Sequence, residues 1–190
     1  MGFGDGRIRV VADDGTDTLS LSTGAPIMAG DVPIHASIGW GLLHEGKTVF
    51  TTNGTNIPWG AASPETRPPS SHPSENALWV HGPDGATLWS FSGGHALQGM
   101  SLGDDGRHLV VGAGDRDTDH RRDLFGALVF DLAHDGSAAG GEPLRATCST
   151  EGPVFFRQAM SRDGRIAVAE HPYSAEDGSV RGAYRVTVLR

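Results

Sequence analysis

The chain has 190 residues, of which 28 are glycine and 11 are proline, and its formal net charge is −8 at pH 7. This negative charge argues against a nucleic-acid partner, because a surface that binds the phosphate backbone needs clustered Arg and Lys. Glycine or proline interrupts nearly every candidate helical stripe. The composition is typical of many short strands joined by turns and predicts an all-β fold.

The sequence carries no visible targeting signal. No basic stretch followed by an apolar stretch stands near the N-terminus, so we expect no secretory signal peptide. No apolar run approaches the roughly 18 residues that a membrane-spanning helix needs. Cys148 is the single cysteine, which excludes an intrachain disulfide and leaves the compartment open. We therefore expect a soluble chain without a membrane span, whose localisation the sequence does not indicate.

Taken in chain order, the predicted strands begin with a hairpin at 7–12 and 17–22 around the letters "DDG". Asp-Gly between two apolar runs is a strong hairpin signal, since glycine tolerates the positive φ of such turns. A first group of four strands is expected at 36–43, 47–53, 76–82 and 86–91. A second group of four is expected at 96–102, 107–113, 125–132 and 143–148. A third group has three strands, at 155–160, 165–170 and 182–189.

A glycine turn between two of these strands recurs three times, in "HEGKTVFTT", "DDGRHLVVG" and "RDGRIAVAE". The turn glycines, Gly46, Gly106 and Gly164, are separated by 60 and 58 residues. A second series, "NALWV", "GALVF" and "GAYRV", follows the three turns. Self-similarity with a period of this size indicates a propeller or a repeat array. A single sheet cannot bury both of its faces, whereas sheets stacked side by side can.

These motifs resemble the blades of β-propellers of the WD40/YVTN or PQQ-like (quinoprotein) type. "MSRDGRIAVAE" is similar to the first hairpin of such a blade, and "GALVFDL" is similar to its third strand. "DGATLWSF" resembles the end of a PQQ-like blade, in which Trp follows Gly by four residues, here Gly85 and Trp89. The resemblance implies a partial β-propeller of about three four-stranded blades, together with an N-terminal hairpin from a further blade.

The expected domain organisation is a single repeat domain over 1–190. The hairpin of the incomplete blade takes 1–22, and the blades take 23–91, 92–148 and 149–190, the last without its outer strand. A propeller ring usually has about four to eight blades, so further blades from the same or another chain are needed to close it. Two explanations stay open, a fragment of a longer propeller and copies that complete one another. The sequence favours the fragment, because exposed end faces and bare strand edges promote aggregation.

The long loops predict which side of the domain binds a partner. Strands alternate in direction, so the connections after the second and the fourth strand of each blade emerge on one side. The long predicted loops, 54–75, 115–124 and 171–181, all fall on this long-loop face. Long loops in a compact domain are often functional. The candidate binding residues on this face are Trp59, His95, Asp115, Asp117, Asp119, His120, Arg121, His171 and Tyr173.

Asp115, Asp117 and Asp119 alternate like the start of a calcium-binding loop, and His120 could add a ligand. The EF-hand pattern needs Gly at its sixth position and an acid at its twelfth, where this chain has His120 and Gly126. The sequence favours a solvated loop in which neighbouring arginines pair with the acids. We therefore expect no cofactor, and a looser Ca²⁺ site is the open alternative.

Aromatic and histidine side chains in the loops allow two interpretations each. Trp59 and Tyr173 could stack on a sugar or a peptide, or could pack their own loops against a blade edge. Histidines in or beside the long loops could converge on a transition metal, but no pair of them has the close spacing typical of such sites. They are His35, His72, His95, His120 and His171.

The sequence favours a non-catalytic module over an enzyme, and we assign no catalytic residue. As the resemblance implies, PQQ-dependent dehydrogenases carry Asp before the blade Gly and Trp after it. Here His81 stands in the Asp place before Gly85, and Gly140 stands where the second blade would have Trp. Vicinal cysteines and a G-x-S-x-G nucleophile elbow are absent from the sequence.

The predicted function is therefore a β-propeller scaffold whose long-loop face binds a protein or a small ligand. The alternative is a piece of a quinoprotein-type dehydrogenase or another propeller enzyme. In that case the active site lies outside this chain or is formed on assembly, because a fold alone does not supply an activity.

Overall fold

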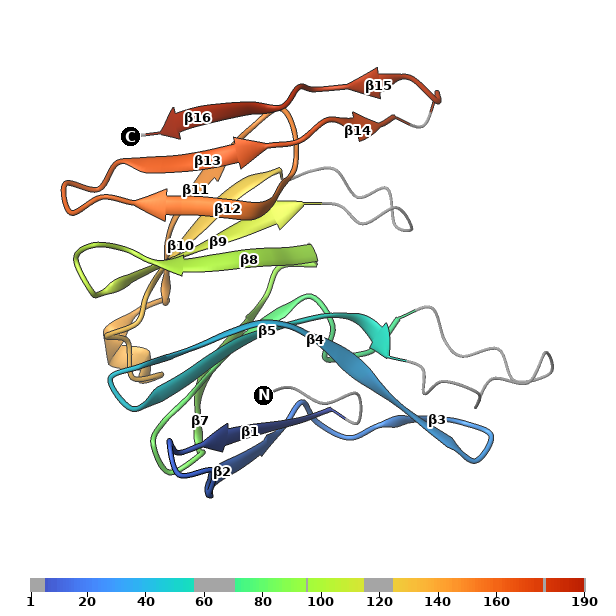
Figure 1. Ribbon diagram of the computed structural model, residues 1–190, viewed down its shortest axis with the longest axis vertical. Helices are drawn as coiled ribbons and strands as arrows, with labels where there is room; N and C mark the ends of the chain where they lie inside the picture. The colour runs from blue at the N-terminus through green and yellow to red at the C-terminus, as the bar shows by residue number, and fades with distance from the viewer. Residues whose placement is uncertain (1–5, 57–70, 95, 115–124, 176, 190) are drawn as a thin grey trace. The chain divides into compact units, whose positions relative to one another are not determined.

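A computed structural model of the chain describes residues 6–56, 71–94, 96–114, 125–175 and 177–189 (Figure 1). Across these residues the structure consists of strands and turns, with one short 3-10 helix, η1 (Ala138–Gly140). The predicted all-β class is confirmed. Within the described part of the chain, no helix is long and apolar enough to cross a membrane. The chain divides into two compact units, Met1–Gly94 and His95–Arg190, called unit 1 and unit 2 below.

Unit 1 contains a two-stranded and a five-stranded antiparallel sheet. The first is the predicted N-terminal hairpin, β1 (Arg7–Val11) and β2 (Asp17–Ser22). The second has the order β3-β4-β5-β6-β7. Its strands are β3 (Ile27–Ala29), β4 (Val32–His44), β5 (Lys47–Asn56), β6 (Ala77–His81) and β7 (Thr87–Ser92). The last four of these lie at the four positions predicted for the first group.

The beginning of the large sheet in unit 1 differs from the prediction. β4 starts at Val32 rather than near 36, because its first residues pair with the short strand β3, which was not predicted. The pairing of β4 with β5 shifts register between Ala36 and Ser37 and again between Ile38 and Gly41. Register shifts of this kind bend a strand, and Figure 1 shows β4 curving along its length.

The β1–β2 hairpin packs against the large sheet of the same unit. Ile8 of β1 and Leu21 of β2 form a buried cluster with Phe50 of β5, at exposed fractions of 6% or less. The turn between β6 and β7 also comes close to the hairpin, because a Cβ on Gly85 would lie 2.8 Å from a methyl carbon of Leu19. The two sheets of unit 1 therefore pack against each other through their apolar side chains.

Unit 2 contains a four-stranded sheet of order β11-β10-β9-β8, a three-stranded sheet of order β12-β13-β16 and the short pair β14-β15. The first has β8 (Ala96–Leu102), β9 (His108–Gly114), β10 (Gly126–Asp131) and β11 (Leu144–Ser149). The second has β12 (Val154–Met160), β13 (Ile166–Glu170) and β16 (Arg185–Leu189). All seven strands lie within three residues of the predicted positions.

The predicted loop 171–181 is not structureless. It contains β14 (Tyr173–Ser174) and β15 (Val180–Arg181), which pair in antiparallel fashion. The turn between them uses the Asp-Gly signal, with Gly178 at φ +76° and the Ser179 N–H donating to Asp177 Oδ1 at 2.9 Å. A short hairpin therefore extends the connection between β13 and β16.

The two larger sheets of unit 2 pack face to face. Val110, Ala127 and Val129 of the four-stranded sheet contact a set of buried residues on the three-stranded sheet, Val154, Met160, Ile166 and Val168. The backbones approach closely, because a Cβ on Gly112 would lie only 2.5 Å from the Val154 carbonyl oxygen. The Ser101 hydroxyl also donates to the Gln158 carbonyl oxygen at 2.8 Å. The core of unit 2 therefore lies between these two sheets.

The close approach at Gly112 makes a stability prediction. In Gly112→Ala the added methyl group would meet the Val154 backbone, so the two sheets must shift apart. We expect a loss of about 1–3 kcal/mol in the free energy of unfolding, measured by urea denaturation followed by circular dichroism.

Gly41→Ala is the matched control on a strand of unit 1. Its Cβ would meet nothing closer than the Val49 carbonyl oxygen at 3.5 Å, which is an ordinary contact. We expect its free energy of unfolding to change by no more than about 0.5 kcal/mol. Equal losses in the two variants would contradict the role of Gly112 in sheet spacing.

Candidate binding surface

Seven of the nine sequence-predicted binding residues lie outside the described residues: Trp59, His95, Asp115, Asp117, Asp119, His120 and Arg121. The Ca²⁺ alternative, which used acids of that set and His120, therefore stays a prediction. Among the side chains that the structure describes, no group of three or more His, Cys, Asp or Glu is placed to hold a metal ion. The two remaining candidates, His171 and Tyr173, both belong to unit 2.

His171 directly follows β13 and lies among aromatic rings. Its imidazole centroid is 5.4 Å from the ring of Phe155, 5.8 Å from that of Phe156 and 5.3 Å from that of Tyr184. Phe156 and Tyr184 meet the imidazole at interplanar angles of 90° and 75°. Edge-to-face contacts at these distances are favourable for aromatic rings. We call these four residues the aromatic–histidine cluster.

Much of this cluster faces solvent. Tyr184 is 78% exposed and Phe156 is 54% exposed, whereas His171 and Phe155 are half-buried. Exposed aromatic rings offer a large apolar area at a low conformational cost, and they are enriched at binding interfaces. The imidazole nitrogens of His171 add hydrogen-bonding capacity. The cluster can therefore pack against a planar or apolar group and accept or donate a hydrogen bond beside it.

Two connections of unit 2 meet at His171. The His171 N–H donates to the Pro153 carbonyl oxygen at 3.0 Å. A Cβ on Gly152 would lie 2.3 Å from the His171 carbonyl oxygen, so only glycine allows the two backbones to come this close. The connection before β12 and the connection after β13 thus lie side by side, as expected for the long-loop side of this unit.

A buried carboxylate anchors both connections. Glu170 is 2% exposed, and the N–H groups of Glu151 and Gly152 donate to its Oε2 at 3.1 and 3.0 Å. Arg185 donates to both carboxylate oxygens at 3.0 Å, and the Thr187 hydroxyl donates to Oε1. Burial acts to raise the pKa of Glu170, but the hydrogen bonds from Arg185, Thr187 and Gly152 outweigh it and lower the pKa to about 2. Glu170 is therefore ionised, and it holds the two connections that carry the aromatic–histidine cluster.

Tyr173 packs differently from His171. Its ring meets Phe125 edge-on, with 4.8 Å between ring centroids, and Phe125 is buried. This contact favours the interpretation in which Tyr173 packs its own loop against the sheet.

Two more of the predicted loop histidines, His35 and His72, lie in unit 1. His72 is 3% exposed, and burial lowers its pKa, with the nearby His35 acting in the same direction. The Ser74 N–H donates to Nδ1 of His72 at 3.0 Å. His95 and His120 of the same predicted set lie outside the described residues, so the transition-metal alternative stays a prediction. His72 itself is a buried side chain of unit 1 whose lowered pKa favours the neutral form.

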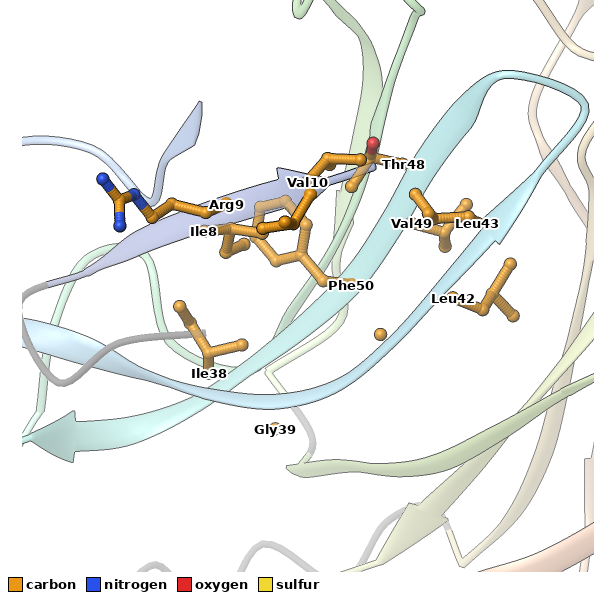
Figure 2. Close-up of a pocket in the computed structure, with 12 residues that line it drawn as sticks. Ile8, Arg9, Val10, Ile38, Gly39, Leu42, Leu43, Thr48, Val49 and Phe50 are labelled. Atoms are coloured by element: carbon orange, nitrogen blue, oxygen red, sulfur yellow. The ribbon is translucent and has the colours of Figure 1, made fainter. Parts of the chain in front are cut away.

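Unit 1 has an apolar cavity of about 570 Å³ between β1 and the strands β4 and β5. Figure 2 shows side chains of the two layers around it. The apolar ones are Ile8, Val10, Val11, Ile38, Leu42, Leu43, Val49 and Phe50. Arg9 is the one charged residue among the described lining residues. This lining suits an apolar occupant and offers no pair of groups for acid–base catalysis.

No protein-family model matches the sequence, and no curated protein matches it. The resemblance to WD40/YVTN or PQQ-like blades therefore rests on the sequence motifs alone.

Phe155, Phe156 and Tyr184 were not among the binding residues predicted from the sequence. A signal for them was present, because the letters "VFF" directly follow a Gly-Pro turn, and Tyr184 stands between the loop 171–181 and the last strand. Aromatic residues at the ends of strands next to long connections are the pattern that could have found them.

The ionised state of Glu170 makes a prediction about acid stability. Its pKa is lowered from 4.5 in a free side chain to about 2, so it contributes stability above about pH 4.5, and this contribution is lost as the pH falls toward 2. We expect Glu170→Gln to lower the free energy of unfolding by about 2 kcal/mol at pH 7. We also expect a flatter pH dependence than that of the wild type between these values, measured by urea denaturation at several pH values.

Glu142→Gln is the control, since Glu142 is an exposed carboxylate in the same unit. We expect this variant to keep both the stability and the acid sensitivity of the wild type. A Glu170→Gln variant with the wild-type pH profile would show that the carboxylate does not anchor the connections.

Proposed function

We propose that this chain is a non-catalytic, propeller-type β scaffold that binds a protein or a small ligand through the aromatic–histidine cluster of unit 2. One observation carries the proposal: the exposed rings of Phe156 and Tyr184 contact His171, which directly follows the buried, ion-paired Glu170. A surface of this kind exposes apolar area that a protein normally buries unless a partner uses it.

The sheet arrangement supports the scaffold part of the proposal. Strands β4 to β7 form one antiparallel meander and strands β8 to β11 form another. Strands β12, β13 and β16 begin a third, which packs face to face against the second. Successive blades of a propeller have this relation, in which each sheet covers a face of the next. We assign the β1–β2 hairpin to a further blade on the same grounds.

The chemistry of the surface supports a ligand with planar or apolar groups. Tyr184 and Phe156 supply ring faces and edges, which pack well against aromatic side chains, proline rings or sugar faces. Arg185 follows Tyr184 in the sequence and forms an ion pair with Glu151 at 2.8 Å. This pair places charges beside the two rings. A polar rim around exposed rings is the usual composition of a protein-binding patch.

The state of the polar side chains supports a binding role over a catalytic one. Arg107 and Arg145 hold Asp131, and Arg185 holds Glu170, so both buried carboxylates that the structure describes in unit 2 belong to structural ion pairs. Burial raises the pKa of the Cys148 thiol, which keeps it protonated and weakly nucleophilic.

Selection from a random peptide library on the immobilised chain tests the proposal. We expect the selected peptides to be rich in aromatic residues or proline. We expect Tyr184→Ala and Phe156→Ala each to weaken their binding about tenfold or more, measured by fluorescence polarisation, because such rings act as hot spots.

Met28→Ala is the control, since Met28 is 56% exposed and lies on β3 of unit 1. It should bind the selected peptides as tightly as the wild type. Peptides that bind Tyr184→Ala and Phe156→Ala with wild-type affinity would contradict the proposed site.

A further inference from the structure

The three-stranded sheet of unit 2 has a second apolar face. Val186 and Val188 of β16 are 72% and 61% exposed. Residues two apart on a strand share a face, and Val186 and Val188 pair with Ala169 and Ala167 of β13. These four residues form what we call the outer face, which lies opposite the face buried against β8 to β11. In the sheet order, β16 also stands at an edge.

Unit 1 has a complementary feature in the cavity beside β1. Among the described strands, β1 has β2 as its sheet neighbour and no other. The apolar side chains of Ile38, Leu42 and Leu43 lie on the other side of the cavity (Figure 2), and Leu43 is 62% exposed. An additional strand beside β1 would extend the hairpin into a larger sheet and cover these side chains.

Unit 2 contains an example of the arrangement that would fill this cavity. There β10 has β11 on one side and β9 on the other. Ala127 of β10 and Val110 of β9 both reach the core that they share with β12 and β13. In unit 1, Ile8 of β1 reaches Phe50 of β5 in the same manner, but the counterpart of β9 is not among the described strands. A strand in that position would lie over the cavity, because β1 lines one side of the cavity and β4 and β5 line the other.

We propose that β16 of a second copy of this chain occupies the cavity. β16 and β1 are both five residues long, and antiparallel pairing of the two would bring Val186 and Val188 over the apolar lining of β4 and β5. Main-chain hydrogen bonds of such strand addition give affinity, and the alternate side chains give specificity. The two surfaces differ, so the contact is heterologous and joins copies head to tail in a ring or a chain.

The charge of the chain sets the salt dependence of this association. Each copy carries a formal net charge of −8, so copies repel one another at low ionic strength. The proposed contact is apolar and does not depend on an ion pair. Association should therefore become tighter when the salt concentration rises from about 0.02 to about 0.3 M, because screening removes the repulsion.

Sedimentation of the full chain over a range of concentrations tests the proposal. We expect the mass to rise with concentration from 19.9 kDa to twice that value and beyond. Two variants block one surface each: Val186→Arg combined with Val188→Arg, and Leu43→Arg. All three positions are exposed, so we expect both variants to fold, as circular dichroism and urea denaturation can verify.

Each blocked variant alone should stay monomeric, and an equal mixture of the two should form a 1:1 pair, because each keeps the surface that the other lacks. Met28→Arg and Val180→Arg are matched controls at exposed apolar positions outside both surfaces, and they should assemble like the wild type. A wild-type chain that stays monomeric up to about 100 μM would overturn the proposal. Assembly of the blocked variants at the wild-type level, or a mixture that fails to pair, would also overturn it. The cluster at His171 is not used in this contact, so its own test stands separately.

Discussion

In unit 2, a four-stranded and a three-stranded sheet each bury one face against the other, where Val110 and Val129 meet Val154 and Val168. A small antiparallel sheet needs such a second layer, because its strands alone cannot remove enough apolar surface from water. Gly112 sets the distance, since any side chain there would meet the backbone of Val154. The same contact holds the start of β12, and it thereby positions the half-buried ring of Phe155 and the exposed ring of Phe156, which follow Val154.

Buried carboxylates tie strand ends together in the same unit. Asp131 ends β10 and accepts hydrogen bonds from Arg107 before β9 and from Arg145 on β11. Hydrogen bonding from Arg107 lowers the pKa of Asp131 well below its usual range, against the effect of burial. Glu170 ends β13 and is held by Arg185 in a similar way. A buried charge is tolerated only with such partners, so both carboxylates favour one strand arrangement over others.

The strands could be predicted from the sequence because their signals are local. Asp-Gly turns such as the one at Gly106 mark the hairpins, and the apolar runs beside them have the length of strands. β3 could not be found in this way, because it has three residues and exists through its pairing with β4. The beginning of β4 was missed for the same reason. Pairing between segments decides such strands, and the local pattern does not show it.

The binding surface was predictable only in part. His171 was found because it stands in a predicted long loop, but its aromatic neighbours stand on or beside strands, where such residues usually belong to the core. Tyr184 reaches His171 because β16 pairs with β13 in the register that sets Arg185 opposite Glu170. That register sets the Arg185 guanidinium against the buried Glu170 carboxylate, a pairing between distant segments that the local sequence pattern does not show.

The same register has a consequence for the surface of the three-stranded sheet. Arg185 and Thr187 turn toward Glu170, so the alternate residues of β16 must point the other way. Those residues are Val186 and Val188, and they lie beside the small side chains of Ala167 and Ala169. Small residues on a sheet face allow another backbone to come near, as Gly112 allows for Val154. The register that pairs Arg185 with Glu170 thus also leaves Val186 and Val188 exposed on the other face of the sheet.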